Sequence, residues 1–214
     1  MKSMLLLTFV TILGCGRDCP APTTGTNAPQ KGSTMKDNPT LATIFARKSV
    51  RRYTGQAPTL DQLTLLVKAG MAAPTAVNRQ PWEFIIVTDA GKLAQLNERL
   101  PYAKMTAKAG SAIVVLGDRD RQHKGPDTDY WITDCSAAIQ NILLAAESLG
   151  LGAVWTAAYP DPERVTAVRE VLGVTAGHLI PLAVIPVGTP TGEDQPKDKW
   201  DRERVFLNEY GKKI

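Results

Sequence analysis

Apolar residues recur at helical spacing in several segments of the chain. A helix is expected from Pro39, with Asn38 as its N-cap, and it carries Leu41, Ile44 and Phe45 as an apolar stripe. A second helix is expected after Thr59. The longest helix is expected within 127–152, where apolar residues recur about every 3.6 positions and small residues fill much of the rest. This composition predicts a central helix that packs on more than one side.

Continuous apolar runs predict the strands. They cover 83–89, 110–117, 153–159 and 178–188, and the run at 110–117 is typical of a strand buried on both faces. Further helices are expected after Asp89 and over 161–173. Helices alternate with a few short strands, which predicts one α+β domain, a sandwich with several helices on one sheet.

The N-terminus has the features of a bacterial lipoprotein. Residues 1–14 combine Lys2 with a short apolar run and read as a signal peptide too short to span a bilayer. Cys15 follows "ILG" and is the expected lipidation site, which predicts attachment to a membrane of the cell envelope. Residues 15–37 are rich in Pro, Gly, Thr and Ser and read as a tether, so the folded domain is expected over 38–214. The alternative is translation from Met35, which predicts a cytoplasmic protein.

Charge and motifs exclude several function classes. The net charge of +4 comes without a basic stripe interleaved with aromatic residues, which argues against nucleic-acid binding. No His, Cys and carboxylate residues have metal-site spacing. Neither G-x-S-x-G nor G-x-G-x-x-G occurs, so neither a hydrolase elbow nor a Rossmann phosphate loop is predicted.

Two stretches carry candidate binding chemistry. In "FARKSVRRYTG", Arg47, Ser49 and Arg51 lie two apart, so an extended chain would project all three to one face. Two guanidinium groups and a hydroxyl suit a phosphate, although a solvated basic turn fits the same spacing. In "APTAVNRQPWEF", prolines stiffen a segment whose Asn78 and Gln80 could bind a planar heterocycle; a rigid turn that packs Trp82 is the alternative.

Taken together, these stretches resemble the FMN-dependent nitroreductase family. The segments "ARKSVRRYTGQAP", "AGMAAPTAVNRQPWEFIIVTD" and "DCSAAIQNILLAAESLGLGAVWTAAYP" occur in the family's order and spacing, and the resemblance covers about residues 38–210. It implies a three-layer sandwich, with helices flanking a mostly antiparallel sheet. It also implies an intertwined homodimer with FMN at the subunit interface.

The resemblance also implies roles for individual residues. It places the flavin's phosphate, ribityl chain and pyrimidine edge against one segment of a subunit, and the ring side against a segment of the other subunit. Ala157 and Ala158 match the backbone beside flavin N5, where many relatives have Glu-Gly, and Lys197 and Lys199 match a basic pair at the phosphate or form a solvated charge run. The first segment contains Arg47, Lys48, Ser49 and Arg51, and the second contains Pro74, Thr75, Ala76 and Asn78.

The activity implied is FMN-dependent oxidoreduction. NADH or NADPH would give a hydride to flavin N5, and a nitroaromatic or quinone would then take it up, without an essential side-chain acid or base. Two alternatives remain. One is a different reduction on the same fold: dehalogenation, azo reduction or enone reduction. The other is a non-catalytic flavin-binding envelope lipoprotein.

Overall fold

The computed structural model describes residues 38–124 and 129–214. The expected signal peptide (1–14), the lipidation site Cys15 and the tether (15–37) lie outside the described residues. Within the described part, no helix is both long and apolar enough to cross a membrane.

An antiparallel sheet forms the centre of the fold. Its order is β1-β2-β5-β3, and β4 also pairs with β5. Every residue of β2 is buried, as the apolar run at 110–117 predicts. The strands are β1 (Trp82–Val87), β2 (Ser111–Asp118), β3 (Gly152–Ala153), β4 (Thr156–Ala157) and β5 (Leu179–Gly188).

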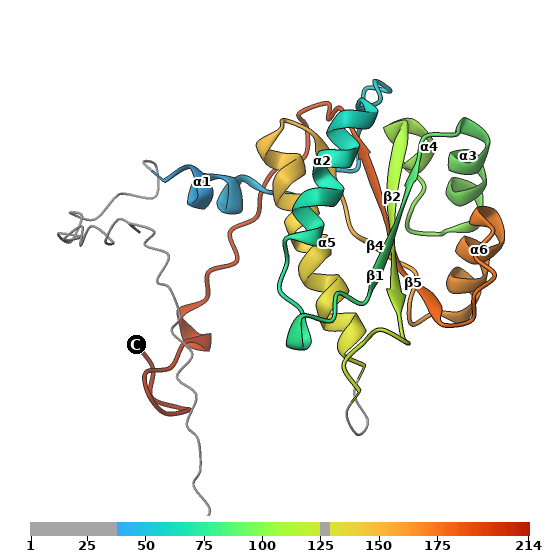
Figure 1. Cartoon of the computed structure of the whole chain (residues 1–214). Coiled ribbons are helices and arrows are strands. Elements are labelled where there is room, and N and C mark those ends of the chain that lie inside the picture. Colours follow the sequence, from blue (N-terminus) through green and yellow to red (C-terminus); the bar gives the residue numbers. More distant parts are fainter. Residues whose placement is uncertain (1–37, 125–128) are drawn as a thin grey trace, which may run out of the picture. The chain divides into compact units, whose positions relative to one another are not determined.

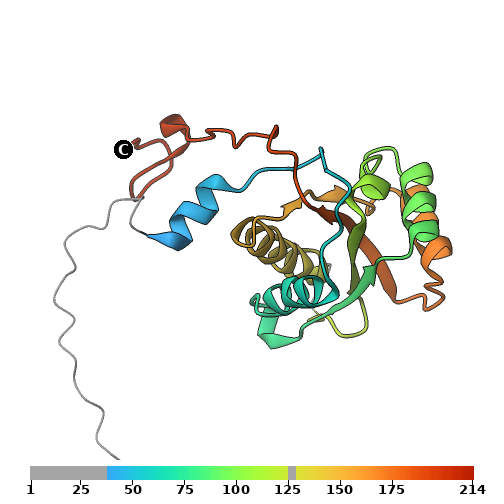
Figure 2. The same ribbon diagram turned by 90° about the horizontal axis from the view of Figure 1, so that it is seen from above.

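Helices cover both faces of this sheet (Figures 1 and 2). One buried cluster joins α2 and α5 to one face, and a second joins α3 and α6 to the other face. The expected three-layer α+β sandwich is therefore confirmed. The helices are α1 (Pro39–Ala46), α2 (Leu60–Met71), α3 (Ala90–Arg99), α4 (Thr106–Ala109), α5 (Tyr130–Ser148) and α6 (Pro162–Leu172), with 3-10 turns η2 (Ala76–Asn78) and η3 (Arg202–Arg204).

Side-chain caps set the starts of these helices. The Asn38 side chain accepts hydrogen bonds from the backbone N–H groups of Thr40 and Leu41. Thr59 and Gln62 form a reciprocal capping box at α2. The Asp89 side chain accepts the Lys92 N–H at α3, and the Asp161 side chain accepts the Glu163 and Arg164 N–H groups at α6, so local sequence signals fix where these helices begin.

The expected strand 153–159 is wrong as a single element, because it is interrupted after Ala153 and ends at Ala157. Its two pieces share one register on β5, since Ala153 lies opposite Val187 and Thr156 opposite Val184. Continuing that register places Pro186 opposite the gap. Proline has no N–H to donate, so the ladder is broken at that point.

Some apolar side chains remain uncovered. The stripe expected on α1 is present, but α1 buries none of its residues: Ile44 is 42% and Phe45 58% exposed. In the C-terminal segment, Trp200 is 68%, Leu207 59% and Tyr210 93% exposed. These side chains are large and apolar, and the described residues of the chain do not cover them.

Candidate functional site

The basic segment 47–53 runs in an extended conformation along β3. Arg47 has φ −58° and ψ 130°, and the Val50 N–H donates to the Ala153 carbonyl at 3.0 Å. Val50 and Tyr53 are buried, and the Tyr53 hydroxyl donates to the Val50 carbonyl at 2.8 Å. Burial raises the pKa of Tyr53, and the nearby Asp194 carboxylate raises it further, so the phenol stays a neutral donor.

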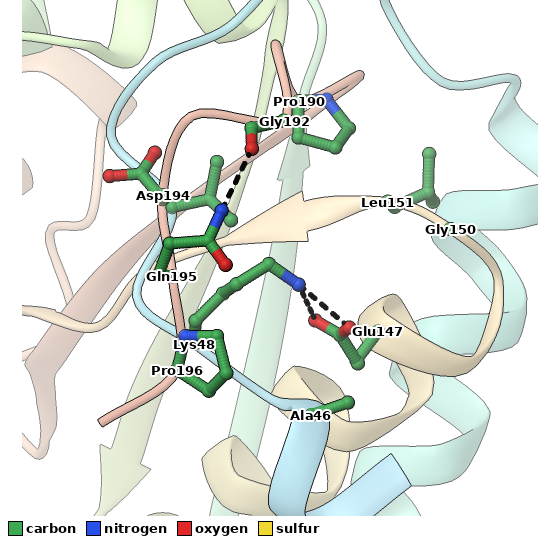
Figure 3. A pocket seen from close by; sticks show the side chains of 11 residues that line it. Ala46, Lys48, Glu147, Gly150, Leu151, Pro190, Gly192, Asp194, Gln195 and Pro196 are labelled. Atoms are coloured by element: carbon green, nitrogen blue, oxygen red, sulfur yellow. Dashed lines mark hydrogen bonds and ion pairs between the residues drawn. The ribbon is translucent and has the colours of Figure 1, made fainter. Parts of the chain in front are cut away.

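The basic side chains of this segment differ in how many partners they have. Lys48 Nζ lies 2.8 and 3.1 Å from the two carboxylate oxygens of Glu147 on α5 (Figure 3). The exposed Arg51 side chain makes one long bond, 3.3 Å, to the Ser49 carbonyl. Within residues 38–124 and 129–214, the side chains of Arg47 and Ser49 have no hydrogen-bond partner, so they remain available to a ligand.

An open cavity of about 390 Å³ lies beside Lys48 (Figure 3). Residues 190–196 form its other wall, and the Asp194 carboxylate there accepts the backbone N–H groups of Arg51 and Arg52 at 3.0 and 3.2 Å. Asp194 therefore holds the basic segment by its backbone and leaves the Arg51 guanidinium exposed. Lys197 follows this wall directly, and Lys197 and Lys199 are both exposed.

The proline-stiffened loop after α2 is a tight turn. Val77, Asn78 and Gln80 have φ values of 44°, 57° and 51°, in the left-handed region that side-chain-bearing residues rarely adopt. The Gln80 N–H donates to Thr75 Oγ1 at 3.1 Å, and Gln80 Nε2 donates to Asn78 Oδ1 at 2.9 Å. Gln80 thus shapes the loop, while Pro74 and Asn78 are exposed on it.

Helix α5 anchors this loop near its N-terminal end. Asp134 Oδ1 accepts the Ala76 N–H at 3.0 Å, and the Cys135 thiol donates to the Pro81 carbonyl at 3.5 Å. Burial raises the pKa of Asp134, while the bond from Ala76 lowers it. Burial, with a smaller contribution from Asp134, raises the pKa of the Cys135 thiol to about 12, so the thiol is unreactive.

The two candidate segments are held at opposite ends of α5 (Figure 1). Asp134 holds the loop, and Glu147 holds Lys48 of the basic segment. The rise of an α-helix is 1.5 Å per residue, so these two anchors lie about 20 Å apart along the axis. One chain therefore does not bring the basic segment and the loop together.

Strand β4 presents a backbone donor. The Ala158 N–H donates to the Leu182 carbonyl of β5 at 2.9 Å. Successive N–H groups of a strand point to opposite sides, so the Ala157 N–H points away from β5. Ala157 is exposed, whereas Ala158 is buried in the core.

The sequence did not single out Asp134, Glu147 or Asp194, although all three hold the candidate segments. Asp134 could have been suspected, because it precedes Cys135 on the apolar side of the longest helix. The other two need knowledge of long-range contacts: Glu147 lies 99 residues from Lys48, and Asp194 lies 143 from Arg51. Among the residues that the structure describes, no three His, Cys, Asp or Glu side chains gather into a metal site.

The chain is similar to several proteins of known sequence and structure. An NADH dehydrogenase/NAD(P)H nitroreductase of Methanothermobacter thermautotrophicus, provisionally named as such, is 39% identical over 170 residues, 79% of this chain and 87% of that protein. A crystal structure with the same provisional name, from Bacteroides thetaiotaomicron, is 47% identical with a TM-score of 0.75, covering 81% of this chain and 99% of its own.

A third relative was crystallised with a cofactor. It is a provisionally named nitroreductase of Desulfovibrio desulfuricans in complex with FMN, 28% identical with a TM-score of 0.69, and it covers 81% of this chain and 98% of its own. The model of the nitroreductase family matches residues 44–101 and 91–189. These matches cover most of the folded part, and the chain belongs to the nitroreductase family.

Proposed function

We propose that the protein is an FMN-dependent NAD(P)H oxidoreductase that reduces small nitroaromatic or quinone-type acceptors. Membership of the nitroreductase family and the FMN complex of a relative support this function. The observation that carries it is the donor set of segment 47–51, where the chain gives the side chains of Arg47 and Ser49 no hydrogen-bond partner among the described residues.

The chemistry of these residues fits FMN. Guanidinium groups bind phosphate oxygens bidentately, and a serine hydroxyl adds a further donor. Arg51 is exposed beside them and suits the negatively charged edge of a reduced flavin. Lys48 belongs to the same set by sequence, but within its own chain it is paired with Glu147. Lys197 and Lys199 would add charge at the phosphate.

FMN supplies the redox chemistry when it is bound, because its N5 accepts a hydride from NADH or NADPH and returns it to the acceptor. The chain's contribution is binding and orientation. The outward N–H of Ala157 would donate to N5, and Arg51 would stabilise negative charge at the N1–C2 edge. Ala157 lacks the carboxylate of the Glu-Gly pair that many relatives have, but the loss of that side chain leaves the backbone contact to N5 possible.

In this proposal the site is shared between the two subunits of a homodimer. About 20 Å of α5 separates the anchor of the basic segment from the anchor of the loop in one chain, which supports a loop supplied by a second copy. The exposed apolar residues of α1 and the C-terminal segment supply a surface for that second copy. Pro74, Thr75, Ala76 and Asn78 would then contact the flavin of the partner subunit.

FMN binding and turnover test the function directly. The purified protein is expected to be yellow, and NADH or NADPH should bleach it without oxygen. Replacing both Arg47 and Arg51 by Ala should raise the Kd of FMN about a hundredfold or more, since each charge-assisted bond contributes about 1.5–3 kcal/mol. Arg99→Ala, which removes an arginine from the other side of the sheet, is the matched control. Unchanged FMN content in the double variant would contradict the assignment.

Mixed dimers test the shared site. One subunit carries Arg47→Ala and Arg51→Ala, and the other carries Thr75→Trp in the loop. If each flavin is shared, one site of the mixed dimer combines both defects and the other has none. The mixed dimer should then bind one FMN, while both parent dimers bind little. A mixed dimer that binds as poorly as its parents would refute the shared site.

Ala157 and Ala158 favour a second candidate function. Without the Glu-Gly pair, and if the protein is exported away from cytoplasmic NAD(P)H, it could bind flavin without catalysis. Yellow protein that neither pyridine nucleotide bleaches would support this alternative. A different reduction on the same fold, such as dehalogenation, azo reduction or enone reduction, would appear in an anaerobic screen of acceptors.

The proposed location is a bacterial envelope membrane, reached through lipidation of Cys15. The motif "ILGCG" and the apolar run before it support this location. Cys15→Ala should release the protein from membranes in fractionated cells, with Cys19→Ala as the control. A soluble wild-type protein would instead indicate translation from Met35.

A further inference from the structure

Asp134 is a buried carboxylate with an incomplete set of partners. Its side chain is 5% exposed, and Oδ1 accepts the Ala76 N–H at 3.0 Å. Oδ2 is buried and has no hydrogen-bond partner in the described part of the chain. The residue lies one turn beyond the start of α5, where the favourable field of a helix N-terminus has largely decayed. Burying a carboxylate here is unfavourable, so its retention needs a reason.

The loop that Asp134 holds is strained. Three of its residues, Val77, Asn78 and Gln80, have positive φ values. Such a conformation persists only where its surroundings over-determine it. The bonds of Gln80 to Thr75 and Asn78 lie within the loop itself and do not fix it to the domain. The bond from the Ala76 N–H to Asp134 fixes the turn to α5.

We propose that Asp134 is a positioning residue for flavin binding. Its carboxylate fixes the Ala76 N–H and thereby sets the conformation of residues 74–78, the loop that contacts the flavin of the partner subunit. The inference rests on the proposed function of this loop. The role is one of positioning and not of contact, because Asp134 is buried and its Oδ1 bonds the backbone of the loop.

The test uses variants on both sides of the bond. Asp134→Ala removes the acceptor, whereas Asp134→Asn keeps an acceptor oxygen and loses the charge. Ala76→Pro removes the donor and leaves Asp134 intact, and proline is tolerated at the first position of a helical turn. Thr133→Ala is the control, because Thr133 is exposed on the same helix and its hydroxyl bonds only locally, to the Tyr130 carbonyl.

Two measurements follow on each full-length protein: the Kd of FMN from flavin fluorescence, and hydrogen exchange of residues 73–81 in the FMN-free dimer. Asp134→Ala and Ala76→Pro should raise the Kd about tenfold or more and speed exchange of the loop, while exchange of β2 stays unchanged. In both properties, Asp134→Asn should be closer to wild type than Asp134→Ala or Ala76→Pro. Thr133→Ala should match wild type.

The two measurements distinguish a failure of the anchoring role of Asp134 from a failure of FMN binding as such. Wild-type protein that does not bind FMN contradicts the proposed function. In that case hydrogen exchange of residues 73–81 still tests whether Asp134 fixes the loop. Unchanged exchange in Asp134→Ala overturns the anchoring role. Faster exchange with an unchanged Kd shows that the loop is not positioned for flavin, and this also overturns the inference. If Asp134→Ala does not fold, Ala76→Pro and Asp134→Asn decide the matter by the same two measurements.

Discussion

The pairing of Lys48 with Glu147 predicts that Lys48 supports the site and does not itself bind FMN. Its Nζ lies within 3.1 Å of both Glu147 oxygens, and the two side chains are 22% and 18% exposed. Glu147→Gln removes the negative charge and keeps the shape of the side chain. Lys48→Met removes the ammonium and keeps the aliphatic stem. The two variants and their combination form a double-mutant cycle.

The solvent exposure of the Lys48–Glu147 pair determines how much stability each variant should lose. An ion pair on the surface contributes about 0–1 kcal/mol, whereas breaking a fully buried pair costs about 3–5 kcal/mol. With about a fifth of each side chain exposed, each single variant should lower the free energy of unfolding by about 1–3 kcal/mol. For a domain of this size each kcal/mol lowers Tm by about 2–4 °C. The double variant should recover part of the loss, with a coupling energy of about 1–2 kcal/mol.

Urea unfolding of the FMN-free protein measures the stability of each variant, and fluorescence titration measures the Kd of FMN. If Lys48 acts through Glu147, both single variants lose stability and both keep the Kd within about threefold, less than 1 kcal/mol. A coupling energy near zero would refute the structural role. A loss of FMN affinity in Lys48→Met that is absent from Glu147→Gln would show that Lys48 contacts the cofactor.

Further predictions concern the core beneath the loop. Gly117→Ala places a methyl group 2.7 Å from Cδ2 of the buried Trp131, so it should destabilise the fold by about 1–3 kcal/mol or more in urea unfolding. With its pKa raised to about 12, the Cys135 thiol should resist iodoacetamide at pH 8 until the protein unfolds, as peptide mapping by mass spectrometry would show. Burial raises the pKa of Asp134 above 3.8, so its contribution to stability is present below that pH and is lost as pH rises through the folded-state value. Wild type should therefore gain stability relative to Asp134→Asn on acidification from neutral pH, measured as the difference in urea midpoints.

Helix starts and buried strands are predictable because their signals are local. A cap such as Asn38 or Thr59 acts on N–H groups two or three residues away, and the sequence contains both partners side by side. The run at 110–117 is apolar at almost every position, which is typical of a strand buried on both faces. These elements depend little on the rest of the chain, so the sandwich follows from them.

The break between β3 and β4 depends on a contact that is distant in the sequence. Residues 153–159 have the composition of one strand, and nothing nearby in the sequence interrupts it. The interruption is set by Pro186, which the pairing of β3 and β4 with β5 places opposite the gap. The proline is visible in the sequence, but its partner is known only once the register is known.

In the candidate site, too, some features follow from the local sequence and others depend on long-range contacts. The types of residue that suit a phosphate can be read from Arg47, Ser49 and Arg51. Which cation remains available depends on Glu147 and Asp194, about 100 and 140 residues away along the chain. The apolar stripe of α1 is a related case: its spacing predicts an amphipathic helix, but the described residues of the same chain bury none of its side chains.

Helix α5 holds both candidate segments, and its geometry supports the proposal that each flavin site is shared between two chains. Asp134 and Glu147 are 13 positions apart on the helix, and at 100° per residue they point about 140° away from each other, besides lying about 20 Å apart along the axis. Each therefore holds its segment on a different side of the helix. A rigid helix of this kind cannot bend to bring its two anchors together, so in one chain the two segments stay at opposite ends of it. Two copies related by symmetry would resolve this, because each basic segment then meets the loop of the other chain. On this argument, the anchors on α5 and the dimer depend on each other, and a stable monomer would have two separate half-sites.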